Sequence, residues 1–127
     1  TGEIAPVAGT SFEFQRKHEI AGSYDHNFCL ADWRRPLAPV AELFSPRSGV
    51  SMGLLTTEPG LQFYTGQGLS GAGSCLGGLG NAAHAGLCLE PQLWPDAPNH
   101  PHFPSIALTP DDSYHQISQF MFSRNRT

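Results

Sequence analysis

The chain has 127 residues, the size of one domain. Its 7 basic and 11 acidic side chains give a formal net charge of −4 at pH 7, so nucleic acid and anionic membranes are poor partners. The 14 glycines and 11 prolines disfavour an all-helical protein, because both residue types break helices. No apolar run approaches the roughly 20 residues that span a bilayer, and the first residues do not resemble an export signal.

The cysteines bear on the cellular compartment of the protein, and the first residues bear on whether the sequence is part of a longer polypeptide. Cys29, Cys75 and Cys88 leave at least one thiol unpaired, and their spacing fits neither a disulfide framework nor a close zinc pair. We interpret them as reduced thiols of a cytoplasmic protein. The sequence starts Thr1-Gly2-Glu3 without an initiator methionine and reads like the middle of a longer polypeptide.

Short apolar runs bounded by turn residues predict antiparallel strands rather than helices. The first two strands are expected at residues 12–16 and 27–31. A hairpin follows, in which strands 40–45 and 50–57 are joined by the turn Pro46-Arg47-Ser48-Gly49. Proline favours the φ of a turn and glycine adopts positive φ, which explains the turn.

The second half alternates strands with irregular segments. A turn at residues 58–60 leads into a strand at 61–65, and residues 66–86, with eight glycines, form a loop before a strand at 86–90. That loop lacks the Lys-Ser/Thr ending or helix start that a phosphate site requires. The five prolines of residues 91–104 predict an extended segment that wraps over a sheet.

The chain closes on strands expected at residues 105–109 and 114–123, joined by the turn Pro110-Asp111-Asp112. No amphipathic helix and no internal repeat is evident. The overall pattern therefore predicts an all-β protein built from antiparallel strands.

Glu90 is a candidate general base. It ends the apolar run Gly86-Leu87-Cys88-Leu89 and precedes Pro91, so its carboxylate is expected at the rim of a buried strand. Desolvation there would raise its pKa toward neutral pH, which suits a general base. The alternative is a solvent-facing strand end.

Asp25 and Gln62 are candidate polar ligands for a substrate. Asp25-His26-Asn27 forms a cluster of donors and acceptors, or simply an Asx-type turn before a strand. Gln62 alternates with Leu61 and Phe63, so it faces either solvent or a polar pocket.

Histidines and aromatic side chains offer further possibilities. His100 and His102, with His84 and Asp96, could ligate a metal, but the prolines around them and the lack of a second clear pair lead us to expect no metal. Four aromatic residues could stack on a sugar or simply pack the core: Phe63, Tyr64, Trp94 and Phe103.

Four segments carry a resemblance to a known family. GSYDHNFCL (22–30), SPRSG (45–49), TTEPGLQFYTG (56–66) and GLCLEPQLWPDAPNHPHFP (86–104) resemble, in this order, the C-terminal part of the aldose 1-epimerase, or galactose mutarotase, family. The resemblance extends over nearly the whole of residues 1–127. Small departures are Val50, where the family usually has arginine, and Gln67, where asparagine is common.

The resemblance implies a large, many-stranded antiparallel β-sandwich, of which this chain is the C-terminal portion. It also implies a cofactor-free isomerase that interconverts the α and β anomers of free aldohexoses such as galactose and glucose. Its general base corresponds to Glu90, its sugar-binding aspartate to Asp25 and a pocket glutamine to Gln62. The family's general-acid histidine lies in the N-terminal half, which is absent here. We therefore expect the chain alone to be inactive and to require that half as a partner.

Two other functions stay open. The chain could be a non-catalytic carbohydrate-binding module that keeps the sandwich. It could also belong to a related sugar-phosphate epimerase, although basic residues for a phosphate are scarce, with one lysine, Lys17, and few arginines near the motifs.

Overall fold

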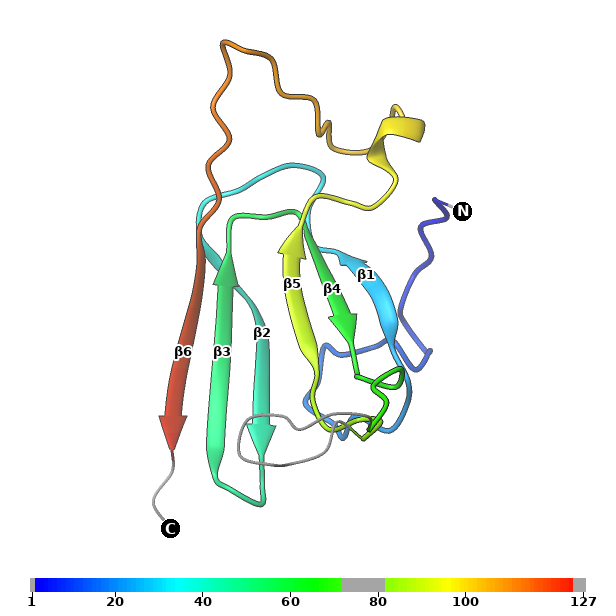
Figure 1. Cartoon of the computed structure of the whole chain (residues 1–127), viewed down its shortest axis with the longest axis vertical. Helices are drawn as coiled ribbons and strands as arrows, with labels where there is room; N and C mark the ends of the chain where they lie inside the picture. The colour runs from blue at the N-terminus through cyan, green and yellow to red at the C-terminus, as the bar shows by residue number, and fades with distance from the viewer. Residues whose placement is uncertain (1, 72–81, 125–127) are drawn as a thin grey trace. The chain divides into compact units, whose positions relative to one another are not determined.

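The computed structural model describes residues 2–71 and 82–124 (Figure 1). Within these ranges the regular structure consists of strands and one short 3-10 helix, and no α-helix occurs. The elements are, in chain order, β1 (Asp25–Cys29), β2 (Ala38–Ser45), β3 (Val50–Thr56), β4 (Gly60–Tyr64), β5 (Cys88–Gln92), η2 (Ala97–Asn99) and β6 (Ser118–Arg124). No helix of the described part has the length and apolar character needed to cross a membrane.

The predicted hairpin is confirmed and forms one of two three-stranded sheets, with order β2-β3-β6. Its register runs from Ala38 opposite Thr56 to Ser45 opposite Val50, with an irregularity near Pro39. The amide of Gly49, at a φ of 69°, donates to the carbonyl of Ser45 at 2.8 Å and closes the turn. β6 pairs antiparallel with β3 on the other side, and the three strands lie side by side in Figure 1.

The second sheet has the order β1-β4-β5, so β4 is central. In the buried strand β4, Leu61 and Phe63 are buried while Gln62 between them is half-buried. β5 lies at an edge of this sheet and contains Pro91, which lacks an N–H and is tolerated at an edge. β4 and β5 match predicted strands with shifts of one or two residues, and β1 begins two residues earlier than expected.

Two compact units divide the described residues. The first consists of residues 1–28 and 62–90, and the second of residues 29–61 and 91–127, as far as the structure describes them. The first unit has an aromatic core whose rings contact one another edge-on, tilted or stacked: Phe12, Phe14, Tyr24, Phe28 and Phe63. The second unit buries Trp94, Ala97 and Phe103 together, and it contains the whole β2-β3-β6 sheet.

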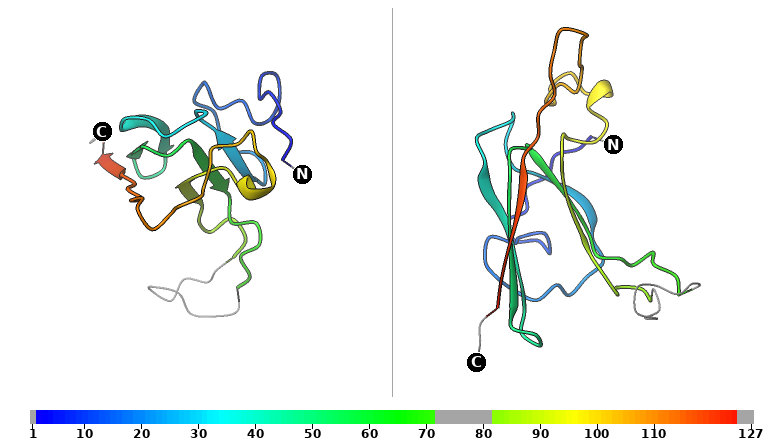
Figure 2. Two further views of the ribbon diagram at one scale, coloured as in Figure 1. Left: turned by 90° about the horizontal axis from the view of Figure 1, so that it is seen from above. Right: turned by 60° about the vertical axis from the view of Figure 1, so that its left-hand side comes forward.

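Two predicted strands are wrong. Residues 12–16 form no ladder, because their backbone bonds are local turns, although Phe12 and Phe14 still point into one aromatic core. Residues 105–109 are exposed. They also lie outside any strand, and Figure 2 draws the orange segment that leads into β6 as a thin coil. In both segments the sequence pattern of a strand was present, but no neighbouring strand pairs with it.

The last strand begins at Ser118 rather than at residue 114. Before it, Asp112 accepts hydrogen bonds from both the amide and the hydroxyl of Thr109, which confirms the predicted turn. Hydrogen bonding of this carboxylate lowers the pKa of Asp112. Of the segment 91–104, Pro91 and Gln92 belong to strand β5, where no strand was expected. Residues 93–104 are irregular apart from η2, as expected, and the indole of Trp94 donates to the Pro59 carbonyl at 2.9 Å.

Candidate active site

Asp25 and Gln62 are in direct contact. Asp25 is the first residue of β1 and Gln62 the central residue of β4. The Gln62 amide Nε2 donates to Asp25 Oδ1 at 2.7 Å. This bond orients both side chains and leaves Asp25 Oδ2 and Gln62 Oε1 as oxygens that can accept hydrogen bonds from hydroxyl groups. Gln62 is half-buried and bonded to Asp25, and its place in a polar pocket rather than toward solvent stays a prediction.

The neighbouring residues fix the position of this pair. The amide of Tyr24 donates to Thr65 Oγ1 at 2.8 Å, and the amide of Thr65 donates to the Tyr24 carbonyl at 3.0 Å. The Tyr24 ring is buried and stacks on Phe63 with a centroid distance of 5.2 Å. Gly22 lies beneath this ring, and a Cβ there would approach it to 3.3 Å. The Asp25–Gln62 pair is thus fixed by the packing of Tyr24 on Phe63 and by the two hydrogen bonds between Tyr24 and Thr65, the residues next to the pair in sequence.

Glu90 is the central residue of β5, but its carboxylate is exposed. The expected burial is wrong, because Cys88 is exposed as well and the other residues of β5 are at most half-buried. β5 is an edge strand, and its outer side is uncovered in the described part of this chain. The role of Glu90 as a base therefore stays a prediction.

The three candidate residues share one sheet and one unit. They lie on adjacent strands in the order Asp25 on β1, Gln62 on β4 and Glu90 on β5. On β4 and β5 the candidate is more exposed than the residues on either side of it. Because side chains alternate between faces, both point to the less buried face, which is also the face of the Asp25–Gln62 bond. The result is an open polar surface that combines a carboxylate with a hydrogen-bonding pair.

His26 has a structural role in this arrangement. Its Nδ1 accepts the Asp25 amide at 3.1 Å, and its ring packs edge-on against Phe12 at 4.7 Å. His26 therefore lies opposite Asp25 along β1, on the aromatic side of the strand. Sequence reasoning missed this aromatic core, although the spacing of Phe12 and Phe14, two residues apart, was a signal for it.

The histidines expected not to bind metal have other partners. His84 Nδ1 lies 2.9 Å from the Thr65 carbonyl, and His100 Nε2 lies 3.1 Å from Asp96 Oδ2. Among residues 2–71 and 82–124, no three His, Cys, Asp or Glu side chains are grouped as metal ligands. A hydrogen bond from the Asn99 amide, aided by His100, lowers the pKa of Asp96.

The candidate stacking residues are mainly part of the protein's own packing. Phe63, Trp94 and Phe103 are buried, and Tyr64 is half-buried with its hydroxyl accepting the Gly68 amide at 2.9 Å. Cys29 and Cys88 are exposed thiols. Cys75 and residues 72–81 of the predicted glycine loop lie outside the described residues.

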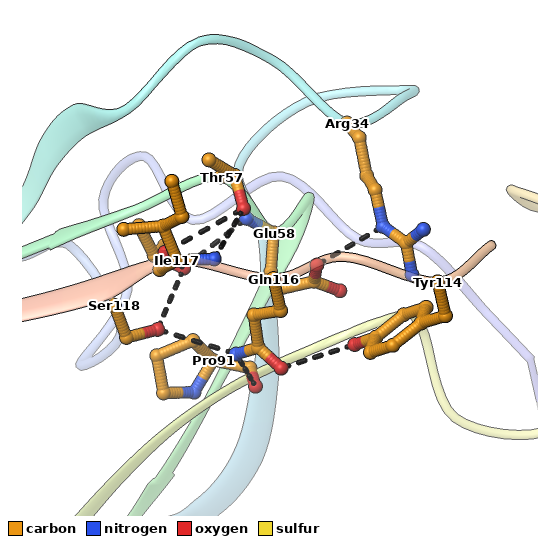
Figure 3. A network of polar contacts seen from close by, with 9 residues as sticks. Arg34, Thr57, Glu58, Pro91, Tyr114, Gln116, Ile117 and Ser118 are labelled. Atoms are coloured by element: carbon orange, nitrogen blue, oxygen red, sulfur yellow. Dashed lines mark hydrogen bonds and ion pairs between the residues drawn. The ribbon is translucent and has the colours of Figure 1, made fainter.

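A polar network in the second unit was not anticipated from the sequence (Figure 3). The Arg34 guanidinium donates to Glu58 Oε1 at 3.0 Å, and the Glu58 side chain is fully buried. Arg34 also lies over the Tyr114 ring, 4.0 Å from its centroid. A further part of the network runs from Tyr114 through Gln116 to the Pro91 carbonyl. The sequence carried no signal for it, because Glu58 lies in the turn expected at residues 58–60.

Comparison with known proteins places the chain in a family. The sequence profile described as aldose 1-epimerase matches residues 1–120. The chain belongs to the aldose 1-epimerase family. It is 40% identical to galactose mutarotase from Bos taurus, over 97% of this chain and 38% of that protein. Aldose 1-epimerase from Escherichia coli K12 is 34% identical, over 94% of this chain and 38% of that protein.

The fold agrees with the sequence match. A crystal structure of a GalM/aldose epimerase homologue from C. elegans superimposes with a TM-score of 0.85 and 26% identity, covering 99% of this chain and 40% of that chain. The resemblance and the all-β fold class expected from the sequence are therefore confirmed. The chain spans 38% of the length of the curated relatives it matches.

Proposed function

We propose that the chain is the base-carrying portion of an aldose 1-epimerase that acts on free aldohexoses such as galactose and glucose. The observation that carries the proposal is the bonded Asp25–Gln62 pair on strands next to the one that carries Glu90, in a member of this family. We use "complete protein" for this chain together with the rest of the family's fold, supplied in one polypeptide or by a second chain.

In the proposed reaction, Glu90 removes the proton of the C1 hydroxyl while an acid protonates the ring oxygen. The C1–O5 bond breaks, and the aldehyde rotates about C1–C2. The ring then closes on the other face of the aldehyde, with both proton transfers reversed. Asp25 and Gln62 bind hydroxyls that do not react, and they hold the sugar while C1 turns. The family's acid, a histidine by resemblance, belongs to the portion outside this chain.

The exposure of Glu90 is compatible with this division of labour. We expect the remaining portion of the fold to cover the polar face of β1, β4 and β5 and to bring the acid opposite Glu90. Catalysis would thus require both portions.

The proposed partner of the chain is the rest of the family's fold, the portion that lies outside residues 1–127. β6 exposes three consecutive large apolar side chains, Phe120, Met121 and Phe122, at 46%, 50% and 69%. Such a run on an edge strand pairs readily with other chains. We propose that the N-terminal portion of the family's fold covers it in the complete protein.

Polarimetry of freshly dissolved α-D-glucose tests the proposed activity. The complete protein should accelerate mutarotation, the chain alone should not, and adding the N-terminal portion in trans should restore the rate. No acceleration by the complete protein, together with galactose binding by calorimetry, would favour the non-catalytic carbohydrate-binding alternative. Acceleration by the purified chain alone would require an acid within residues 1–127, with His26 and His84 the first candidates.

A further inference from the structure

The backbone directly after Glu90 is held by a side chain from far along the sequence. Gln116 Nε2 donates to the carbonyl of Pro91 at 3.1 Å, across 25 positions of the chain (Figure 3). We propose that Gln116 is a positioning residue for Glu90, and that Tyr114 holds Gln116 in the orientation it needs. The inference rests on the proposed role of Glu90 as the base.

Strand β5 needs such support for two reasons. It is an edge strand, so only one side of it has a neighbour in the β1-β4-β5 sheet. Pro91 also lacks an N–H and removes one possible ladder bond immediately beside the base. A hydrogen bond to the Pro91 carbonyl restricts the Pro91–Gln92 peptide, one peptide beyond Glu90, and so limits how far the strand around Glu90 can shift.

Both the nitrogen and the oxygen of the Gln116 side-chain amide make hydrogen bonds. A proline carbonyl can only accept, so Nε2 must face Pro91 and the amide cannot be flipped. Nε2 also lies 3.2 Å from Ser118 Oγ, and the Tyr114 hydroxyl donates to Oε1 at 3.0 Å. The two hydrogen bonds donated by Nε2 and the one accepted by Oε1 thus fix the plane of the amide. The Tyr114 hydroxyl is the group that selects this orientation from the far end.

Tyr114 is itself fixed to a buried anchor. The Arg34 guanidinium lies 4.0 Å from the centre of the Tyr114 ring and is bonded to Glu58, whose side chain is fully buried. Glu58 follows strand β3, and its amide donates to Thr56 Oγ1 at 3.1 Å. The chain of contacts therefore connects an exposed amide to the interior of the second unit, where positions vary least.

The chemical consequence concerns turnover rather than sugar binding. Gln116 bonds to the backbone of Pro91, whereas Asp25 and Gln62, the pair proposed to bind the sugar, bond to each other. A misplacement of about 1 Å at a catalytic group can cost up to about a hundredfold in rate while substrate contacts stay intact. Loosening Gln116 should therefore lower kcat and leave KM near its original value.

The test uses the complete protein and steady-state mutarotase kinetics. Gln116→Met keeps the length of the side chain and removes its hydrogen bonds, and Tyr114→Phe keeps the ring over Arg34 and removes only the hydroxyl. We expect kcat to fall about tenfold or more in Gln116→Met and by less in Tyr114→Phe, with KM within about twofold in both. Gln119→Met, on exposed strand β6, is the matched control and should leave both constants unchanged.

A double variant separates positioning from simple loss of structure. Once Glu90→Gln has removed the base, Gln116→Met should cause no further loss, because groups that act as a unit are not additive. Additive losses, a raised KM or an unchanged kcat in Gln116→Met would overturn the positioning role. If Glu90→Gln itself leaves the rate unchanged, the proposed function fails instead, so the two failures are distinguishable.

Discussion

The replacement of Glu90 by glutamine tests the central assignment, because the structure predicts a large effect on rate and almost none on stability. The carboxylate is exposed on an edge strand, between half-buried Leu89 and Pro91. Substitutions at such surface positions change the free energy of unfolding by about 0.5 kcal/mol or less. Glutamine has nearly the same size and also fits a strand, so β5 should keep its place in the sheet.

The effect on catalysis should be far larger. The amide of glutamine cannot take a proton at neutral pH, and a positioned base is worth about two to four orders of magnitude in rate. At about 1.4 kcal/mol per tenfold, this corresponds to about 3 to 5 kcal/mol of transition-state stabilisation. Polarimetry of α-D-glucose with the complete protein measures the rate, and thermal unfolding followed by circular dichroism measures the stability.

The control for Glu90 is Glu19→Gln, which neutralises another exposed glutamate, one that lies outside any strand. It should change neither quantity beyond experimental scatter. A Glu90→Gln protein that retains more than about a third of the wild-type rate would remove Glu90 from the role of base, since even weak general bases contribute more than that. A large loss of stability in the variant would contradict the exposure on which the argument depends.

Three further outcomes follow from the structure. Asp25→Ala and Gln62→Ala in the complete protein should each weaken galactose binding or turnover by about 1 to 3 kcal/mol. The losses in the double variant should be less than additive, because the two side chains share one hydrogen bond. Wild-type affinity and wild-type turnover in both single variants would show that the two residues are structural. The isolated chain should elute from a sizing column as oligomers or aggregates because of the apolar run on β6 around Phe122, and a monodisperse monomer would contradict this. Because the folded-state pKa of Asp96 is lowered, its stabilising contribution is present above the ordinary carboxyl pKa and is lost as pH falls through the lowered value. Asp96→Asn, a residue that tolerates the φ of 62° at this position, should therefore weaken the dependence of the unfolding temperature on pH in the acid range. An unchanged acid dependence would refute the stabilising bond between Asp96 and Asn99.

The sequence predicted several elements well because their signals are local. The turn at Pro46 to Gly49 needs only a proline φ and a glycine with positive φ, so the hairpin could be placed before any tertiary contact was known. Buried strand β4 carries its own alternation, with Gln62 between Leu61 and Phe63. Motif order likewise identified the family, because it depends on residue types and spacing alone.

Tertiary structure decided which extended segments became strands and how exposed each candidate side chain is. Residues 12–16 have the pattern of a strand but no partner, and a ladder requires a second backbone that only the fold can bring close. Glu90 seemed to end a buried strand because its neighbours are apolar, yet burial depends on what covers an edge strand. The support of Pro91 by Gln116 joins residues 25 positions apart, and no local signal predicts such a contact. The candidate residues of the site could therefore be proposed from the sequence, whereas their exposure and their hydrogen-bond partners depend on groups distant along the chain.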